Sequence, residues 1–350
     1  MLIRSQPGQP TIAPLAHGGD IAAARTMFPG APEPFIDLST GINPHPWPYP
    51  RPLPALPGEI FARLPDRASI RQLAAVAATA YGAPSPEHVV PAPGTQILLP
   101  QVAGLLKPGK AIILRTTYAE HGRAAQLAGH AVAEAADVSE LRDADLAIVV
   151  NPNNPDGRIV EKRALLTLAD ALGQRSGILV IDESFADVAP DTSLVGETDR
   201  ANIIVLRSFG KFYGLAGLRL GFAMAAPRLA NRLDTMLGPW AVAGPAVAIG
   251  EQALADGEWK RRTLERLASG AKRLDELLVD AGLEIAGGTP LYRLTRSRNA
   301  GDLFSRLGRA GVLVRRFTEE PTWLRWGLPA GENEWQRLSV ALRQWKGEIP

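Results

Sequence analysis

A single lysine, Lys211, stands in the apolar and glycine-rich stretch RSFGKFYGLAGLRLGF, which covers residues 207–222. The strand-like run NIIVL precedes this stretch, and its last residues begin another apolar run. A cation in such surroundings must reach solvent, meet a negative partner or take part in chemistry. Residues elsewhere in the chain must decide which of these roles Lys211 has.

Polar residues follow the other strand-like runs at the points where those runs end. They are Gly94-Thr95-Gln96 after HVVPAP, Thr117-Tyr118 after IILRT, Asn154 after LAIVV, Asp182-Glu183 after ILVI, and Ser208 after IIVL. Ligands of open parallel sheets bind at the carboxyl ends of strands, so we expect these groups to converge on one edge. Taken singly, Gly94-Thr95 could be only a helix cap, Asn154 part of a turn, and Asp182 a solvated carboxylate.

Together these groups match the requirements of pyridoxal phosphate. Its aldehyde needs a lysine, and its pyridine nitrogen needs a carboxylate. Its phosphate needs backbone N–H groups at a helix N-terminus, a hydroxyl and an arginine, and its ring needs an aromatic face. This ligand also accounts for Lys211, because covalent attachment to the cofactor removes the charge of the amine.

The elements that must position these groups follow from the alternation of apolar and amphipathic segments after residue 66. Runs such as AIILRT, LAIVVN, ILVIDE, NIIVLR and LGFAM predict buried strands, and the segments between most of them predict helices. This alternation predicts an α/β fold with a mainly parallel central sheet covered on both faces. A long charged helix at 258–282 and a small α+β domain follow.

The first 60 residues hold a large share of the 30 prolines, as in NPHPWPYPRPLPALPGE. Proline lacks a donor N–H and fixes φ, so an extended arm is expected here. The arm could be a disordered tail, but the apolar anchors FIDLS and Trp47 favour an ordered arm. We therefore expect an arm over 1–50, a large cofactor-binding domain over 51–240 and a small domain over 241–350.

Composition narrows the classes of function. The 38 Lys and Arg nearly balance 36 Asp and Glu, so no strong field for nucleic acid or membrane is expected. The chain has no cysteine, which excludes disulfides, thiolate nucleophiles and cysteine-ligated metals, and we predict no metal site. It shows no secretory h-region and no run of about 18 apolar residues. We expect a soluble cytoplasmic protein.

The stretch SFGKFYGLAGLRLGF resembles the lysine signature of the fold-type-I pyridoxal phosphate enzymes, the aspartate aminotransferase superfamily, and the resemblance extends over nearly the whole chain. It implies that Lys211 binds the cofactor aldehyde and carries protons, that Asp182 pairs with the pyridinium, and that the enzyme is a homodimer. The other implied contacts are Gly94, Thr95, Gln96, Ser208 and Arg219 at the cofactor phosphate, Tyr118 against the ring, Asn154 at the ring hydroxyl and Arg325 at the substrate carboxylate. Three positions depart from related sequences, namely Phe185 in place of tyrosine, Leu64 in place of a tyrosine that reaches the partner subunit, and Asp156 in place of threonine.

Within the superfamily, the chain is most similar to the threonine-phosphate decarboxylases of cobalamin biosynthesis. The similarity lies in HGGD at His17–Asp20, in LSTGINPHP with Thr40 and Asn43, and in Phe185. It implies that the arm and Arg315 in GVLVRRF help to hold a substrate phosphate, and that Asn154 also contacts substrate. The implied reaction converts L-threonine O-3-phosphate to (R)-1-aminopropan-2-yl phosphate.

Two alternatives remain. An aminotransferase acting on histidinol phosphate or a related phosphorylated amine would share every cofactor contact. A transcription regulator would need an added basic helical module, which the proline-rich N-terminal residues do not supply.

Overall fold

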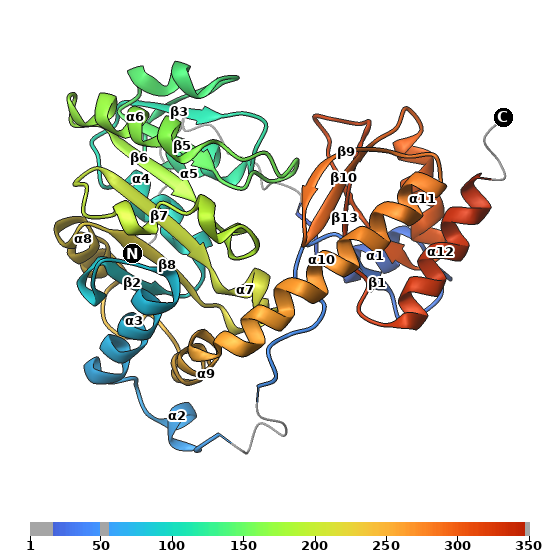
Figure 1. Ribbon diagram of the computed structural model, residues 1–350, viewed down its shortest axis with the longest axis horizontal. Helices are drawn as coiled ribbons and strands as arrows, with labels where there is room; N and C mark the ends of the chain where they lie inside the picture. Colours follow the sequence, from blue (N-terminus) through green and yellow to red (C-terminus); the bar gives the residue numbers. More distant parts are fainter. Residues whose placement is uncertain (1–16, 50–55, 347–350) are drawn as a thin grey trace, which may run out of the picture.

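The computed structural model describes residues 17–49 and 56–346 of the chain. A seven-stranded sheet occupies one lobe in the order β2-β8-β7-β6-β5-β3-β4 (Figure 1). Its strands are β2 (Val89–Ala92), β3 (Lys110–Leu114), β4 (Ala131–Ala135), β5 (Leu146–Val150), β6 (Ile178–Asp182), β7 (Ile203–Ser208) and β8 (Gly221–Ala225). The strands β4, β3, β5, β6 and β7 pair in parallel, whereas β8 runs antiparallel to both of its neighbours. The predicted α/β fold with a mainly parallel sheet is confirmed.

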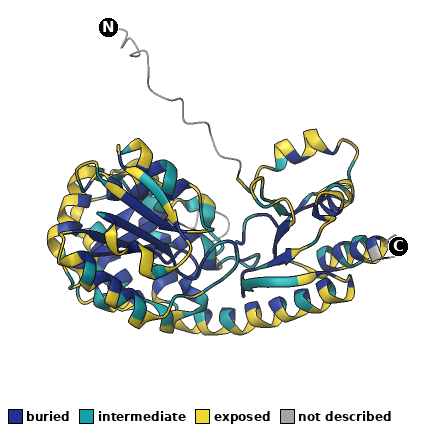
Figure 2. Cartoon of the chain, turned by 90° about the horizontal axis from the view of Figure 1, so that it is seen from above, coloured by how far each residue is buried: buried dark blue, intermediate teal, exposed yellow. Residues whose placement is uncertain are grey.

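Helices surround this sheet, and buried strands fill its centre (Figure 2). The helices of this part of the chain are α2 (Glu59–Ala62), α3 (Arg67–Tyr81), α4 (Leu98–Ala103), α5 (Glu120–Leu127), α6 (Lys162–Gly173), α7 (Phe209–Phe212), α8 (Pro227–Leu237) and α9 (Gly244–Ala255). Every residue of β5, β6 and β8 is buried, which explains why their sequences are continuous apolar runs rather than alternating ones. By contrast β4, AVAEA, lies at the sheet edge and is partly exposed, and its sequence did not predict a strand.

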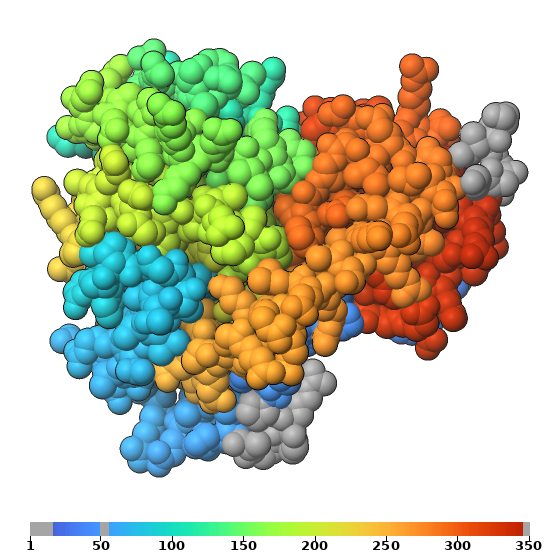
Figure 3. All heavy atoms as spheres, in the orientation of Figure 1, coloured from blue at the N-terminus to red at the C-terminus, as the bar shows by residue number. Residues whose placement is uncertain are grey.

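A second, smaller lobe carries a four-stranded antiparallel sheet in the order β12-β13-β10-β9. Its strands are β9 (Glu284–Thr289), β10 (Tyr292–Arg296), β12 (Arg315–Arg316) and β13 (Trp323–Gly327), and its helices are α11 (Ala300–Arg309) and α12 (Glu332–Lys346). The long helix α10 (Gly257–Asp280) runs from the large lobe to the small one and is the orange rod of Figures 1 and 3. The predicted α+β character of the C-terminal segment is confirmed.

The described part of the N-terminal arm packs on the body of the protein. Strand β1 (Ile36–Asp37) pairs in parallel with β11 (Val312–Leu313), which ties the arm to the small lobe. Trp47 is buried and its indole N–H lies 3.1 Å from a carboxylate oxygen of Asp256. The arm also contains a helix that its sequence did not predict, α1 (Ile21–Met27), which Asp20 caps. Residues 1–16 and 50 of the predicted arm lie outside the described residues.

Over residues 17–49 and 56–346, no helix is long and apolar enough to cross a membrane.

Candidate active site

A cavity of about 580 Å³ opens at the carboxyl ends of the central strands, where the large lobe, the arm and the small lobe meet. Its wall contains every residue that the sequence predicted for the site except Asn43. These residues are His17, Thr40, Gly94, Thr95, Gln96, Tyr118, Asn154, Asp182, Ser208, Lys211, Arg219, Arg315 and Arg325. Residues from distant parts of the sequence therefore line one space, as expected for the strand ends of a parallel sheet.

Lys211 lies in the short helix α7, directly after β7. Its Nζ contacts the carbonyl oxygen of Thr40 at a long 3.5 Å, and none of the described carboxylates forms an ion pair with it. Burial, together with the positive charge of Arg325, lowers the pKa of Lys211 to about 8. An amine with this pKa has a large neutral fraction near pH 8, so it can act as a nucleophile toward an aldehyde.

Asp182 ends strand β6 and its side chain is buried. Its Oδ2 lies 2.9 Å from Nε2 of His121, and its Oδ1 accepts hydrogen bonds from the backbone N–H and hydroxyl of Ser184. Burial alone would raise the pKa of Asp182, but the hydrogen bonds and charge of His121 and the bonds from Ser184 keep it below the usual value. The carboxylate is therefore ionised and can pair with a cation inside the cavity.

A cradle for a phosphate forms where Gly94 faces Arg219. Gly94 has a φ of 85°, and a Cβ there would lie 2.6 Å from the guanidinium of Arg219. Arg219 itself has a φ of 55°, a conformation uncommon outside glycine. A Cβ on Gly221 would lie 2.7 Å from the backbone nitrogen of Thr95. These positions exclude larger side chains, so backbone N–H groups and a guanidinium remain accessible to an anion.

The Gln96 side chain contacts two other residues of the cavity wall. Its Nε2 lies 2.9 Å from Oε2 of Glu120, and its Oε1 lies 3.0 Å from the hydroxyl of Tyr118. Glu120 also contacts Nε2 of His17 at 3.0 Å. Gln96 therefore fixes the Tyr118 ring through its side chain, and only its backbone remains for a phosphate.

Arg325, in strand β13, is buried and lines the cavity from the small lobe. One Nη donates to Oδ1 of Asn154 and the other donates to the carbonyl oxygen of Ser39 at 2.6 Å. Burial, together with the charge of Arg315, lowers the pKa of Arg325 to about 10. Both partners are neutral oxygens, and no carboxylate among the described residues forms a salt bridge with Arg325.

Thr40 and Asn43 occupy different positions. Thr40 lines the cavity and presents its carbonyl oxygen to Lys211. Asn43 is buried outside the cavity wall, where its amide donates to the carbonyl of Phe212 at 2.8 Å and its oxygen accepts from the backbone of His45. The structure therefore does not bring Asn43 together with the other predicted substrate ligands. It holds the arm against α7 instead.

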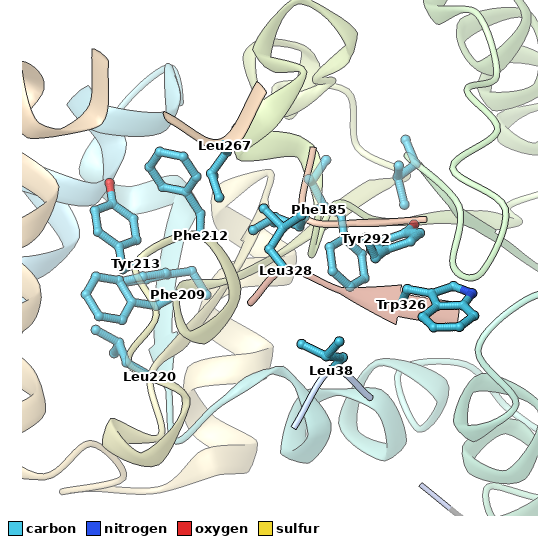
Figure 4. Close-up of a cluster of buried hydrophobic side chains, with 14 of the residues drawn as sticks. Leu38, Phe185, Phe209, Phe212, Tyr213, Leu220, Leu267, Tyr292, Trp326 and Leu328 are labelled. Carbon is cyan, nitrogen blue, oxygen red and sulfur yellow. The ribbon is translucent and has the colours of Figure 1, made fainter. Parts of the chain in front are cut away.

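The three positions that depart from related sequences, Phe185, Leu64 and Asp156, also have clear surroundings. Phe185 is buried and packs edge-on against Tyr292, with ring centroids 4.9 Å apart (Figure 4). The Tyr292 hydroxyl donates to the backbone carbonyl of Asn153. Leu64 follows α2 and is 65% exposed, far more than a core leucine. The third, Asp156, accepts a hydrogen bond from the side-chain amide of Asn153, as expected of a turn residue.

Sequence reasoning assigned no role to two buried residues, Glu120, which lines the cavity, and His121, which contacts Asp182. Both lie in the first turn of α5, two and three residues after Tyr118. The only signal was their position next to a predicted ring-stacking residue at a strand end. Their burial within an amphipathic helix could not be read from the sequence, because EHGRAAQL has the pattern of a solvated helix start.

The chemistry of this wall fits pyridoxal phosphate. A nucleophilic amine, an ionised buried carboxylate, an aromatic ring and an anion cradle surround one space, and these are the groups that its aldehyde, pyridine nitrogen, ring and phosphate require.

A family model described as aminotransferase class I and II matches residues 35–341. The chain is 42% identical over 335 residues to a threonine-phosphate decarboxylase of Pseudomonas aeruginosa. The alignment covers 95% of this chain and 98% of that protein. It is also 42% identical over 337 residues to a threonine-phosphate decarboxylase of Sinorhizobium sp, covering 94% of this chain and 98% of that protein.

Among solved structures, the histidinol-phosphate aminotransferase of Sinorhizobium meliloti in complex with pyridoxal 5'-phosphate superimposes with a TM-score of 0.84. The superposition covers 100% of this chain and 99% of the aminotransferase chain, at 21% sequence identity. At this identity the superposition shows a shared fold.

Proposed function

The chain belongs to the aminotransferase class I and II family of pyridoxal phosphate enzymes, and we propose that it decarboxylates L-threonine O-3-phosphate. The product would be (R)-1-aminopropan-2-yl phosphate, for use in cobalamin biosynthesis. We further propose that the enzyme is a cytoplasmic homodimer. The 42% identity over almost the full length of two threonine-phosphate decarboxylases supports this substrate over other phosphorylated amines.

The observation that carries the proposal is the buried guanidinium of Arg325 in the same cavity as Lys211. Its protein partners are the neutral oxygens of Asn154 and Ser39. A buried cation is stable only when an anion or several hydrogen bonds compensate for its lost hydration. A substrate α-carboxylate would supply this anion through a charge-assisted, bidentate pair.

The phosphate of the substrate would bind on the arm side. Arg315 begins strand β12 and lines the cavity, as does His17 of the arm. Burial lowers the pKa of Arg315, although the group stays charged at any ordinary pH. Arg315 and Arg325, two of the arginines that line the cavity, suit a substrate with anions at both ends.

When bound, pyridoxal phosphate supplies an aldehyde for the substrate amine and a ring that accepts the electron pair of the broken bond. Asp182 and His121 would keep the ring nitrogen protonated, which makes the ring a better acceptor. Arg325 would hold and orient the substrate carboxylate, which would leave as carbon dioxide. Lys211 would then deliver one proton to Cα in its place.

The test is release of carbon dioxide from L-threonine O-3-phosphate by the purified holoenzyme, with and without 2-oxoglutarate. We expect equal release in both samples, because decarboxylation needs no keto-acid acceptor. Formation of glutamate from 2-oxoglutarate and histidinol phosphate, without carbon dioxide from threonine phosphate, would instead identify an aminotransferase.

A further inference from the structure

Glu120 is a buried carboxylate in the cavity wall to which the proposed chemistry assigns no task. Its side chain is only 6% exposed. One oxygen lies 3.0 Å from Nε2 of His17, and the other lies 2.9 Å from Nε2 of Gln96 and 3.3 Å from a nitrogen of Arg123. Three side chains from three separate segments of the chain thus converge on one carboxylate.

The placement of this carboxylate is unfavourable for a site that binds anions. The cavity must accept the cofactor phosphate and, on the proposed function, a substrate with a carboxylate and a phosphate. A negative charge in the same wall repels all three, and burying it costs free energy unless it is paired. Asp182 pairs with His121 and would face the cofactor ring, whereas the ion pairs of Glu120 are with His17 and Arg123. Its value to the site must therefore come from the groups that it holds.

The groups held by Glu120 join the arm to the cofactor wall. His17 is the first described residue of the arm, and its side chain is 45% exposed. Gln96 connects to the hydroxyl of Tyr118, and the His17 ring lies 5.9 Å from the Tyr118 ring. Arg123 is one turn along the same helix, so its contact with Glu120 is a local i,i+3 pair and fixes no other segment.

The segment that follows His17 is locked to the wall that carries Arg325. The Gly19 N–H donates to the hydroxyl of Ser39 at 2.7 Å, and a Cβ on Gly18 would lie 2.4 Å from the Ser39 carbonyl oxygen. That same carbonyl accepts a hydrogen bond from Arg325. The arm therefore contacts the carboxylate-binding arginine through Ser39 at one end and the cofactor wall through Glu120 at the other.

We propose that Glu120 is a positioning residue that docks the N-terminal arm on the cavity through His17. Nε2 of the imidazole contacts Glu120, which leaves the other ring nitrogen for a further partner. Because His17 also lines the cavity, a substrate phosphate bound there would be that partner. The docking part of this inference stands on the geometry alone, whereas the phosphate contact rests on the proposed function.

The first test measures docking without any substrate. Hydrogen exchange of the holoenzyme, followed by mass spectrometry on peptides covering residues 17–28, reports the Gly19 N–H and the start of α1. Glu120→Gln should raise exchange in this segment by about tenfold, because a charge-assisted bond to the arm is lost. Glu33→Gln is the matched control, since Glu33 pairs with Arg25 on the same segment at an exposed site, 2.7 Å apart. Equal exchange in Glu120→Gln and the parent enzyme would overturn the proposal.

The second test is a double-mutant cycle with His17→Gln and Glu120→Gln, read as KM and kcat for threonine phosphate. Each single variant should raise KM about tenfold with kcat within about twofold, and the double variant should add little to either. The absorbance of the bound cofactor should not change. Additive effects on KM would show that the two residues act separately, and a fall in kcat without a rise in KM would contradict a positioning role. If the parent enzyme does not act on threonine phosphate, the proposed function fails, while the exchange experiment still decides whether Glu120 docks the arm.

Discussion

Nε2 of His121 lies 2.9 Å from Oδ2 of Asp182, and both side chains are buried. His121 lies in the first turn of α5, three residues after Tyr118, the predicted ring-stacking residue. The start of this one helix therefore supplies the partner of the Asp182 carboxylate. The imidazole replaces the water that would otherwise stabilise the ionised carboxylate. Removal of either member of this pair should therefore change the electronic state of the bound cofactor before it changes the affinity for it.

Asp182→Asn should still bind pyridoxal phosphate but should decarboxylate at least about 10²-fold more slowly. An amide cannot keep the ring nitrogen protonated, so the ring accepts the electron pair less readily. The measurement is kcat alongside the absorbance of the bound cofactor. Near-normal turnover by this variant would show that Asp182 has only a structural role.

His121→Phe should have a smaller effect in the same direction. The pKa of Asp182 lies below its usual value partly because of the hydrogen bond and charge of His121, so loss of the imidazole raises it. A higher pKa means a weaker preference for the ionised carboxylate, and we expect kcat to fall about tenfold. His121→Gln retains a donor and should recover part of this loss. If the two variants have the same kcat, the hydrogen bond does not matter for the reaction.

Lys211 should be the residue to which the cofactor aldehyde becomes covalently attached. Borohydride reduction of the holoenzyme, followed by peptide mapping, should place the label on Lys211 and on no other lysine. Because its pKa is about 8, the amine is neutral above that pH and protonated below it. The rate of cofactor capture by the apoenzyme should therefore rise as pH increases through about 8, instead of near the ordinary lysine value of 10.5. A label on another lysine would refute the assignment.

The sequence predicted those parts of the site that depend on strand ends. Lys211, Asp182 and Asn154 each follow a continuous apolar run, and parallel strands bring such positions to one edge whatever the details of packing. Arg219 was predictable because it stands in a motif with fixed spacing from Lys211, and Gly94 because it follows the strand-like run HVVPAP.

Contacts set by helix burial and by the path of the arm were not predictable. The burial of Glu120 and His121 depends on how α5 packs on the sheet, and their polar sequence gives no sign of it. The orientation of Asn43, which was predicted to contact substrate, was not predictable for a related reason, since a polar residue in an arm can turn toward the cavity or toward a backbone carbonyl. Its amide donates to Phe212, and this choice depends on the local turn at His45.

Exposed apolar residues near α2 lead to a prediction about assembly. Phe61 and Leu64 are 55% and 65% exposed, and α2 packs on α9 of the large lobe. Clustered apolar side chains on a surface are typical of protein interfaces. We expect a homodimer by light scattering, and we expect the double variant Phe61→Asp, Leu64→Asp to shift it toward monomer. Leu127→Asp is the control, because Leu127 is 57% exposed on α5. A fully active monomeric parent enzyme would contradict this prediction.

Substitutions of Arg315 and Arg325 distinguish a decarboxylase from an aminotransferase most clearly. Arg315→Ala should weaken the use of a phosphorylated substrate by roughly ten- to a hundredfold in kcat/KM, because a buried charge-assisted bond contributes about 1.5–3 kcal/mol. The absorbance of the cofactor should be unchanged, since Arg315 belongs to the small lobe whereas the predicted phosphate contacts Gly94 and Arg219 belong to the large lobe. A change in absorbance would place Arg315 at the cofactor instead.

Arg325→Ala should impair every substrate with an α-carboxylate, because its guanidinium is the buried cation whose partners in the cavity are neutral oxygens. Histidinol phosphate has no carboxylate, so its binding should be spared, whereas decarboxylation of threonine phosphate should fall by about 10²-fold or more. Loss of Arg325 also removes a positive charge beside Lys211, so the pKa of that amine should rise above about 8. Measuring the pH dependence of cofactor capture in this variant separates a lost carboxylate site from a collapsed cavity. A collapsed site would lose capture at all pH values, whereas the expected variant captures the cofactor with its pH profile moved upward.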